Sequence, residues 1–202
     1  MWGLVESGSI TKLINKPKGL VIGDVRYSRK IFELWSKSEL EAKGIYEVEM
    51  DNSKKKDEQW YVNTNITYAF GSGKVTGSYG DATAKAHADT LFTAQDETDG
   101  LGTEGEVKDR GLKYNLIRTI KKEAAQILQD TDWYITRKAD AGTAVPSSIT
   151  NHRAAVRTKA AEMETAITNA SDTPALETLY TYTKQEDGSV TRPLGELPTL
   201  ED

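Results

Sequence analysis

Apolar residues recur at steps of three and four positions through residues 105–171. This spacing puts them on one face of an α-helix, because successive helical turns bring such positions into line. Two stripes of this kind are separated by a polar segment, which predicts two long amphipathic helices. The apolar members of the first stripe are Ile117, Ile120, Ala124 and Ile127/Leu128, with Lys113 at the same spacing, and the second stripe runs through Ile149, Val156, Ala160, Met163, Ile167 and Ala170.

A turn at residues 129–134 is expected to join the two helices and to fold them back antiparallel. Trp133 lies at this elbow, where its large ring can cap the groove between the helices while its indole N–H reaches a carbonyl. The second helix is expected to begin after Pro146, with a serine hydroxyl, of Ser147 or Ser148, accepting a hydrogen bond from a free amide. The segment therefore predicts a scaffold of two packed helices.

Alternation of apolar and polar residues, which is typical of half-buried strands, dominates residues 1–80. Residues 59–70 keep this alternation longest and are predicted to form the longest strand. Ser36 and Glu39 have the spacing of a capping box, and Gly44 suits the left-handed position that follows a short helix. The predicted strands are residues 2–5, 10–14, 20–22, 45–50, 59–70 and 75–79.

Residues 81–110 are small, acidic and rich in glycine, which predicts an extended linker, although residues 82–92 can pair as an extra strand with Leu91 and Phe92 as its anchors. After the helical pair, Thr173 as a cap and Pro174 in the first turn predict a short helix. Residues 186–188 (Glu-Asp-Gly) lie between two strand-like runs and predict a hairpin. The closing residues 193–202 carry three leucines and are expected to lie against another surface.

These elements predict an α+β fold in three parts. A small β-rich N-terminal domain takes residues 1–80, and the acidic Gly-rich linker takes residues 81–110. An antiparallel helical hairpin, with a short helix, a C-terminal β-hairpin and a tail, takes residues 111–202. The length of 202 residues is enough for one large or two small domains.

Charge and composition exclude several classes of partner. Lysine and arginine number 26 against 31 acidic residues, a net charge of −5, which disfavours a nucleic-acid backbone as a partner. The chain has no cysteine, so it has neither disulfides nor a thiolate metal site. It also lacks a continuous apolar run of the length that spans a membrane, and we expect a protein made and kept in solution.

The candidate catalytic motifs are weak. Residues 100–105 match the glycine pattern of dinucleotide-binding loops, but an acidic run precedes them where a buried strand is needed. The same acids lack the spacing of a calcium loop, and neither His87 nor His152 has the partners of a catalytic triad or zinc site. The 31 acids leave open a pair of carboxylates for glycoside hydrolysis. We nevertheless expect no catalytic, cofactor-binding or metal-binding residue, and no enzyme.

Arg153 and Arg157, one helical turn apart, are the most suggestive charged pair. They can clamp an acidic partner, or they can form ion pairs within the chain with Asp130, Asp132 or Glu164, which we favour. Apolar residues of the second helix left over from its packing can contact another protein, since burial of one large apolar side chain is worth roughly 1.5–3 kcal/mol. The predicted partner-binding residues are Trp133, Arg153, Val156, Arg157, Met163 and Ile167.

Three short runs also carry a family resemblance: residues 127–133 (Ile-Leu-Gln-Asp-Thr-Asp-Trp), 145–147 (Val-Pro-Ser) and 152–157 (His-Arg-Ala-Ala-Val-Arg). In this order and at this separation they resemble the Leu-x-x-Thr-Asp-Trp and Tyr-Arg-x-x-Val/Leu-Arg pattern of bacteriophage tail assembly chaperones, a module that recurs in tail-fibre-associated proteins. The resemblance covers residues 112–180. His152 departs from it, because the pattern has an aromatic residue, usually tyrosine, at that position.

The resemblance implies a non-enzymatic bacteriophage tail protein that binds a tail or tail-fibre protein. It leaves open two roles: an assembly chaperone or fibre-associated component, or a permanent structural component of the tail or baseplate. It places the protein in the host cytoplasm during assembly and, in the second role, in the virion tail. Neither nucleic acid nor a membrane is expected as a partner, and self-association into a homo-oligomer is left open.

Overall fold

The computed structural model describes residues 1–200. The chain divides into two compact units, Met1–Thr83 and Ala84–Asp202. The first is rich in strands, and the second contains the long helices and a C-terminal β-hairpin, so the predicted α+β fold is confirmed. The last two residues of the predicted tail, 201–202, lie outside the described residues.

The first unit is built on a five-stranded sheet with the strand order β2-β1-β5-β8-β7. β1 pairs antiparallel with both β2 and β5, and β7 pairs antiparallel with β8. β5 and β8, in contrast, run parallel. β1 with β2, and β7 with β8, therefore form two antiparallel hairpins. The strands are β1 (Trp2–Glu6), β2 (Ser9–Ile14), β5 (Ile45–Asp51), β7 (Thr67–Gly71) and β8 (Lys74–Ser78).

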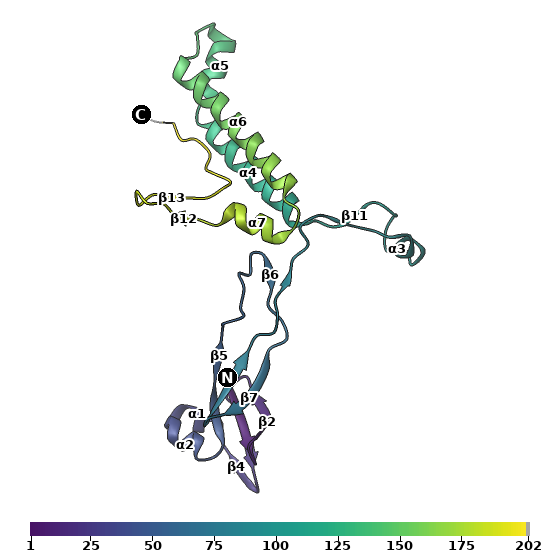
Figure 1. The fold of residues 1–202 in the computed structure, drawn as a ribbon, viewed down its shortest axis with the longest axis vertical. Helices are drawn as coiled ribbons and strands as arrows, with labels where there is room; N and C mark the ends of the chain where they lie inside the picture. Colours follow the sequence, from purple (N-terminus) through teal and green to yellow (C-terminus); the bar gives the residue numbers. More distant parts are fainter. Residues whose placement is uncertain (201–202) are drawn as a thin grey trace. The chain divides into compact units, whose positions relative to one another are not determined.

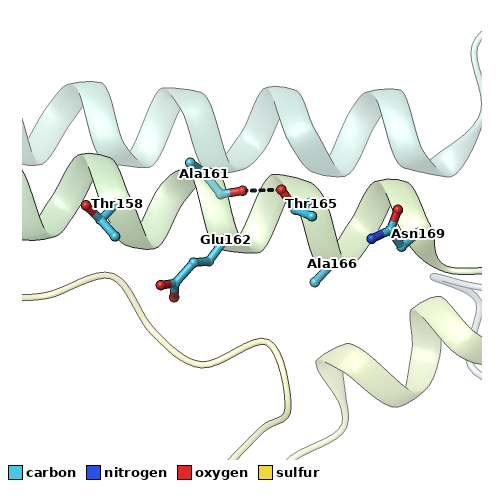
Figure 2. A pocket seen from close by; sticks show the side chains of 6 residues that line it. All are labelled: Thr158, Ala161, Glu162, Thr165, Ala166 and Asn169. Atoms are coloured by element: carbon cyan, nitrogen blue, oxygen red, sulfur yellow. Dashed lines mark hydrogen bonds between the residues drawn. The ribbon is translucent and has the colours of Figure 1, made fainter.

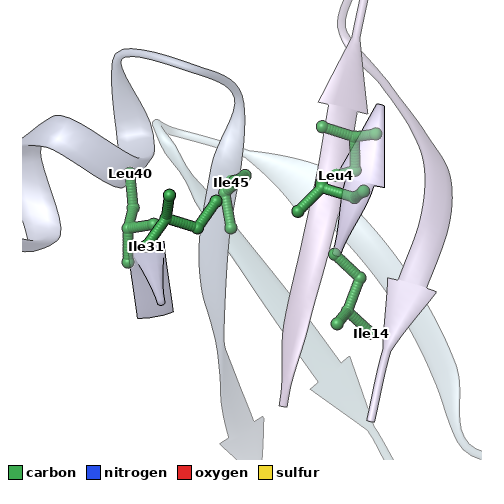
Figure 3. Close-up of a cluster of buried hydrophobic side chains, with 6 residues drawn as sticks. Leu4, Ile14, Ile31, Leu40 and Ile45 are labelled. Carbon is green, nitrogen blue, oxygen red and sulfur yellow. The ribbon is translucent and has the colours of Figure 1, made fainter. Parts of the chain in front are cut away.

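Two short helices and a small hairpin pack beside this sheet. β3 (Leu20–Ile22) and β4 (Val25–Tyr27) form the hairpin, and α1 (Ile31–Leu34) and α2 (Lys37–Glu41) follow. The predicted capping box begins α2. The Ser36 hydroxyl accepts from the amide of Glu39, whose carboxylate accepts from the Ser36 amide at 2.7 Å. The core beneath these elements consists of Leu4, Ile14, Leu20, Ile31, Leu40 and Ile45 (Figure 3).

Residues 59–70 do not form the single long strand that their alternation predicts. They contain a two-residue strand, β6 (Tyr61–Val62), and the start of β7, with irregular chain between them. Asn65 in this gap has a φ of 59°, a left-handed conformation that cannot belong to an extended strand. Side-chain alternation did not reveal the break because it carries no information about φ. β9 (Thr83–Ala84) follows at the end of this region.

The second unit is organised around two long helices, α4 (Leu112–Gln129) and α6 (Ser147–Asn169), which lie side by side (Figure 1). Ile120 and Ala124 of α4 are buried, as are all six residues of the stripe predicted on α6. The antiparallel helical pair is therefore confirmed. α6 begins after Pro146, but no side chain caps it, so the capping role predicted for a serine hydroxyl at this position is wrong.

Residues 81–110 do not form the extended linker that their composition suggests. β10 (Thr90–Leu91) and β11 (Val107–Asp109) pair antiparallel, and α3 (Ala94–Thr98) lies between them. We call residues 90–109 the arm. Figure 1 shows that the arm extends away from α4 and α6. It doubles back because Gly100 and Gly105 adopt positive φ, and because the Phe92 amide donates to the Glu106 carbonyl at 2.9 Å.

The C-terminal elements are a helix and a hairpin, as predicted: α7 (Thr173–Tyr180), β12 (Thr183–Lys184) and β13 (Val190–Thr191). Asp172, rather than Thr173, caps α7, since its carboxylate accepts from the Ala175 amide. The tail then returns to the helices. Leu194 is buried, and its amide donates to the Leu179 carbonyl at 3.0 Å, which agrees with the expected packing of this segment against another surface.

Candidate functional site: an exposed surface on α5

A third helix, α5 (Asp132–Ala141), stands where the sequence predicts a simple turn between the long helices. α4 ends because Thr131 leaves helical geometry, with φ −112° and ψ 6°. α5 begins at once with Asp132, an acid in the first turn, where the helix dipole favours negative charge. It ends at Gly142, whose φ of 71° is the left-handed conformation of a helix C-terminus. The elbow is thus a structured element with its own surface.

α5 contributes no buried residue to the unit, although it carries three large apolar or aromatic side chains. Trp133 is 57% exposed and Ile135 is 43% exposed. The expectation that Trp133 caps the groove between the long helices is therefore wrong, because the ring lies on the outer side of an additional helix. Exposed large apolar residues grouped on one short element are typical of interaction sites.

Trp133, Tyr134 and Arg137 form a stacked cluster on this helix. The two rings lie 5.6 Å apart between centroids, and the Arg137 guanidinium lies 4.5 Å from the Trp133 ring centroid and 5.4 Å from that of Tyr134. The spacing of three and four residues in a helix brings these side chains together. Such cation–π contacts hold a guanidinium in one place. We call Trp133, Tyr134, Ile135 and Arg137 the α5 surface.

The Arg137 guanidinium has unused hydrogen-bonding capacity. Its Nε is buried and has no hydrogen-bond partner within residues 1–200, and no acidic side chain there forms an ion pair with this arginine. Tryptophan, tyrosine and arginine are the residues that most often dominate binding energy at protein interfaces. The α5 surface therefore has the chemistry of a contact for a protein that presents a carboxylate beside an apolar patch.

Arg153 holds α5 in place from the second long helix. Its Nη1 donates at 2.6 Å both to the Leu128 carbonyl and to the Thr131 hydroxyl, and its Nη2 lies 2.9 Å from the Asp132 carboxylate. Both Arg153 and Thr131 are buried. The predicted internal pairing of Arg153 with an acid of the elbow is confirmed, so this arginine positions the junction of α4 and α5 from within.

The remaining predicted partner-binding residues divide into two groups. Val156, Met163 and Ile167 are fully buried in the helical unit, so they are unavailable to a partner while the unit stays folded. Arg157 is exposed, and its Nη1 donates to the Arg153 carbonyl at 3.4 Å. Of the six predicted residues, Trp133 and Arg157 thus remain at the surface and the other four belong to the interior.

The sequence-based prediction missed Tyr134, Ile135 and Arg137. One pattern in the sequence could have indicated them. Arg137 follows Trp133 by four residues and Tyr134 by three, and this spacing brings the side chains together only if the segment is helical. Because residues 129–134 were interpreted as a turn, this spacing carried no meaning.

A hollow of about 600 Å³ lies along the outer side of α6 (Figure 2). Figure 2 shows the short side chains that line it, and the Thr165 hydroxyl donates to the Ala161 carbonyl at 2.8 Å. Glu162 is the one titratable residue among those lining it, and its carboxylate lies 3.6 Å from Lys159 Nζ. The hollow is therefore an open surface of mainly short side chains, without converging acid and base groups. It is lined by Thr158, Ala161, Glu162, Thr165, Ala166 and Asn169.

The two histidines lie apart from the α5 surface. His152 is buried at the elbow, beside Asp130 and Thr131, where it lines a cavity of about 280 Å³. His87 is half-buried near the base of the arm. Within residues 1–200 no three histidine or acidic side chains are arranged to hold a metal ion. Over the same residues no helix combines the length and apolar character needed to cross a membrane.

Comparisons with known proteins give no match. No model of a known protein family matches the chain, and neither the curated proteins nor the solved structures include a significant match.

Proposed function

We propose that this chain is a non-enzymatic bacteriophage tail protein that binds a tail or tail-fibre protein through the α5 surface. The observation that carries the binding role is the cluster of the exposed Trp133 and the half-buried Arg137, in which an arginine without an acidic partner within residues 1–200 lies against the indole ring. The phage context rests on the resemblance of residues 112–180 to tail assembly chaperones.

The residues of that resemblance have a consistent physical role in the second unit. The Thr-Asp-Trp run supplies Thr131 and Asp132, which bind Arg153 of the second motif, and Trp133, which faces outward. The two motifs therefore meet at the elbow. Arg153 of the second motif fixes Thr131 and Asp132 of the first, and Trp133 of the first remains exposed. This arrangement supports a module that presents an aromatic side chain to a partner on a rigid base.

Binding is tested by co-expression of the tagged full chain with each tail and tail-fibre protein of the encoding phage, one at a time. For the protein that binds, the affinity of Trp133→Ala and Arg137→Ala variants is measured by isothermal titration calorimetry. A central aromatic contact is worth at least about 2 kcal/mol, so Trp133→Ala should weaken binding roughly 30-fold. Thr136→Ala, on the same helix and exposed, is the matched control and should change the affinity less than about twofold.

Both variants should keep the helical circular dichroism of the parent chain, because α5 supplies no buried residue to the unit. The proposal fails if no tail or tail-fibre protein binds, or if Trp133→Ala and Arg137→Ala bind as tightly as Thr136→Ala. Immunoblotting of purified particles then separates the two roles. A chaperone is absent from finished virions, whereas a structural component of the tail or baseplate is present at a fixed copy number.

A further inference from the structure

The arm, residues 90–109, is an ordered projection without a core. None of its residues is buried. Leu91 and Val107 lie opposite each other in the β10–β11 pair, so both point to the same face of the ribbon, and they are 50% and 37% exposed. Leu101 at the tip is 61% exposed. An isolated two-stranded hairpin is marginally stable in water, so an arm of this kind gains most of its stability by lying on another surface.

The charge of the arm indicates that this other surface is basic. The arm holds six acids and one lysine, a formal charge of −5, which equals the net charge of the whole chain. The lysine, Lys108, forms an ion pair with Asp96, with its Nζ 2.7 Å from the Asp96 carboxylate. The other five acids are exposed and form no ion pair within residues 1–200. They are Glu97, Asp99, Glu104, Glu106 and Asp109.

The complementary charge lies on the outer side of α4. This helix has four basic residues and one acid, a formal charge of +3, and two of the four, Lys113 and Lys121, bond to residues of α6. Arg118 and Lys122, one turn apart, are exposed and have no acidic partner in the described part of the chain. Tyr114, one turn before Arg118, is 40% exposed on the same face, and the Arg110 guanidinium lies 4.2 Å from its ring centroid, which adds a further positive charge beside the ring. α6 packs on the opposite side of α4, so this face is open.

We infer that the arm of one copy docks on the outer face of α4 in a second copy of this chain. The exposed Leu91 and Val107 then lie against apolar surface such as the Tyr114 ring, and the acids of the arm face Arg118 and Lys122. The contact uses surfaces separate from α5, so it goes beyond the proposed partner binding and does not depend on it. Electrostatic complementarity of this kind sets the register of an interface and makes it sensitive to salt.

The experiment measures the molar mass of the full chain by sedimentation velocity over a range of concentrations, at low and at high salt. We expect concentration-dependent association at low salt that weakens at high salt. One variant reverses the charge of the outer face of α4 (Arg118→Glu with Lys122→Glu). Another reverses two charges of the arm (Glu104→Lys with Glu106→Lys). Each alone should associate at least about tenfold more weakly, because like charges then meet.

An equimolar mixture of the two variants restores opposite charges at each contact, and it should associate as the parent chain does. Lys184→Glu, an exposed reversal in β12, is the control and should leave association unchanged. Circular dichroism checks that every variant keeps its helices. The inference is overturned if the parent chain has the mass of a single copy at every concentration, or if the mixture stays dissociated. Neither result touches the binding test on α5.

Discussion

Replacing Arg153 with methionine tests whether this buried arginine holds the elbow together. The change removes two hydrogen bonds of 2.6 Å, to the Leu128 carbonyl and the Thr131 hydroxyl, and an ion pair with Asp132. A hydrogen bond to a charged donor is worth roughly 1.5–3 kcal/mol, and we take the lower value because Leu128 keeps the Thr131 hydroxyl as a donor. The Asp132 pair adds less than about 1 kcal/mol, since that carboxylate is 58% exposed.

These contributions sum to about 3–4 kcal/mol, and methionine recovers part of this by removing the cost of burying a guanidinium. We therefore expect Arg153→Met to lower the free energy of unfolding by about 2–3 kcal/mol. Urea titration followed by circular dichroism at the helical band measures it. Arg157→Met, one turn along the same helix but exposed, is the control and should cost less than about 0.5 kcal/mol. Equal losses for the two variants would refute the reasoning.

Two further predictions concern a turn and a carboxylate. Gly44 has a φ of 75°, and a Cβ there would meet the Val5 carbonyl oxygen, so Gly44→Ala should destabilise the first unit by about 2–4 kcal/mol in urea titration. Gly8→Ala, with a similar φ but open space, should cost only about 1 kcal/mol, and equal costs would contradict the steric argument. The pKa of Asp96 is lowered from 3.8 to about 2, and the hydrogen bond from Lys108 is the largest cause of this shift. Because the folded arm favours the ionised form, this stabilisation is present above pH 3.8 and is lost as the pH falls through about 2. An NMR titration of the Asp96 carboxyl should show this midpoint, and Lys108→Met should move it upward; an unchanged midpoint would exclude the pairing.

Much of the helical unit could be predicted because its signals are local. The stripe through Val156, Met163 and Ile167 follows the period of the helix, and all three residues are buried where that period places them. The capping box of Ser36 and Glu39 is equally local, since its hydrogen bonds join residues three positions apart. Such features need only neighbouring residues, so they can be identified without the fold.

The α5 surface could not be predicted in the same way. Trp133 is a large aromatic residue at a junction, and burial is the ordinary expectation for it. Its exposure depends on whether residues 132–141 form a turn or a further helix. Arg153, which lies more than twenty residues beyond Leu128 and Thr131 in the sequence, bonds to both residues at the junction of α4 and α5, and no local pattern indicates this contact. The role of Arg137 follows only from the presence of that helix.

The sequence by itself determined the helix periods, the capping box of α2, the turn at Gly44 and the α+β character of the chain. Tertiary structure alone decided the parallel pairing of β5 with β8, the folding back of the arm and the exposure of Trp133. The physical reason is the separation in sequence between the residues that interact. Local features depend on hydrogen bonds and rotamer preferences between residues a few positions apart, whereas pairing and exposure depend on which distant surfaces meet when the whole unit packs.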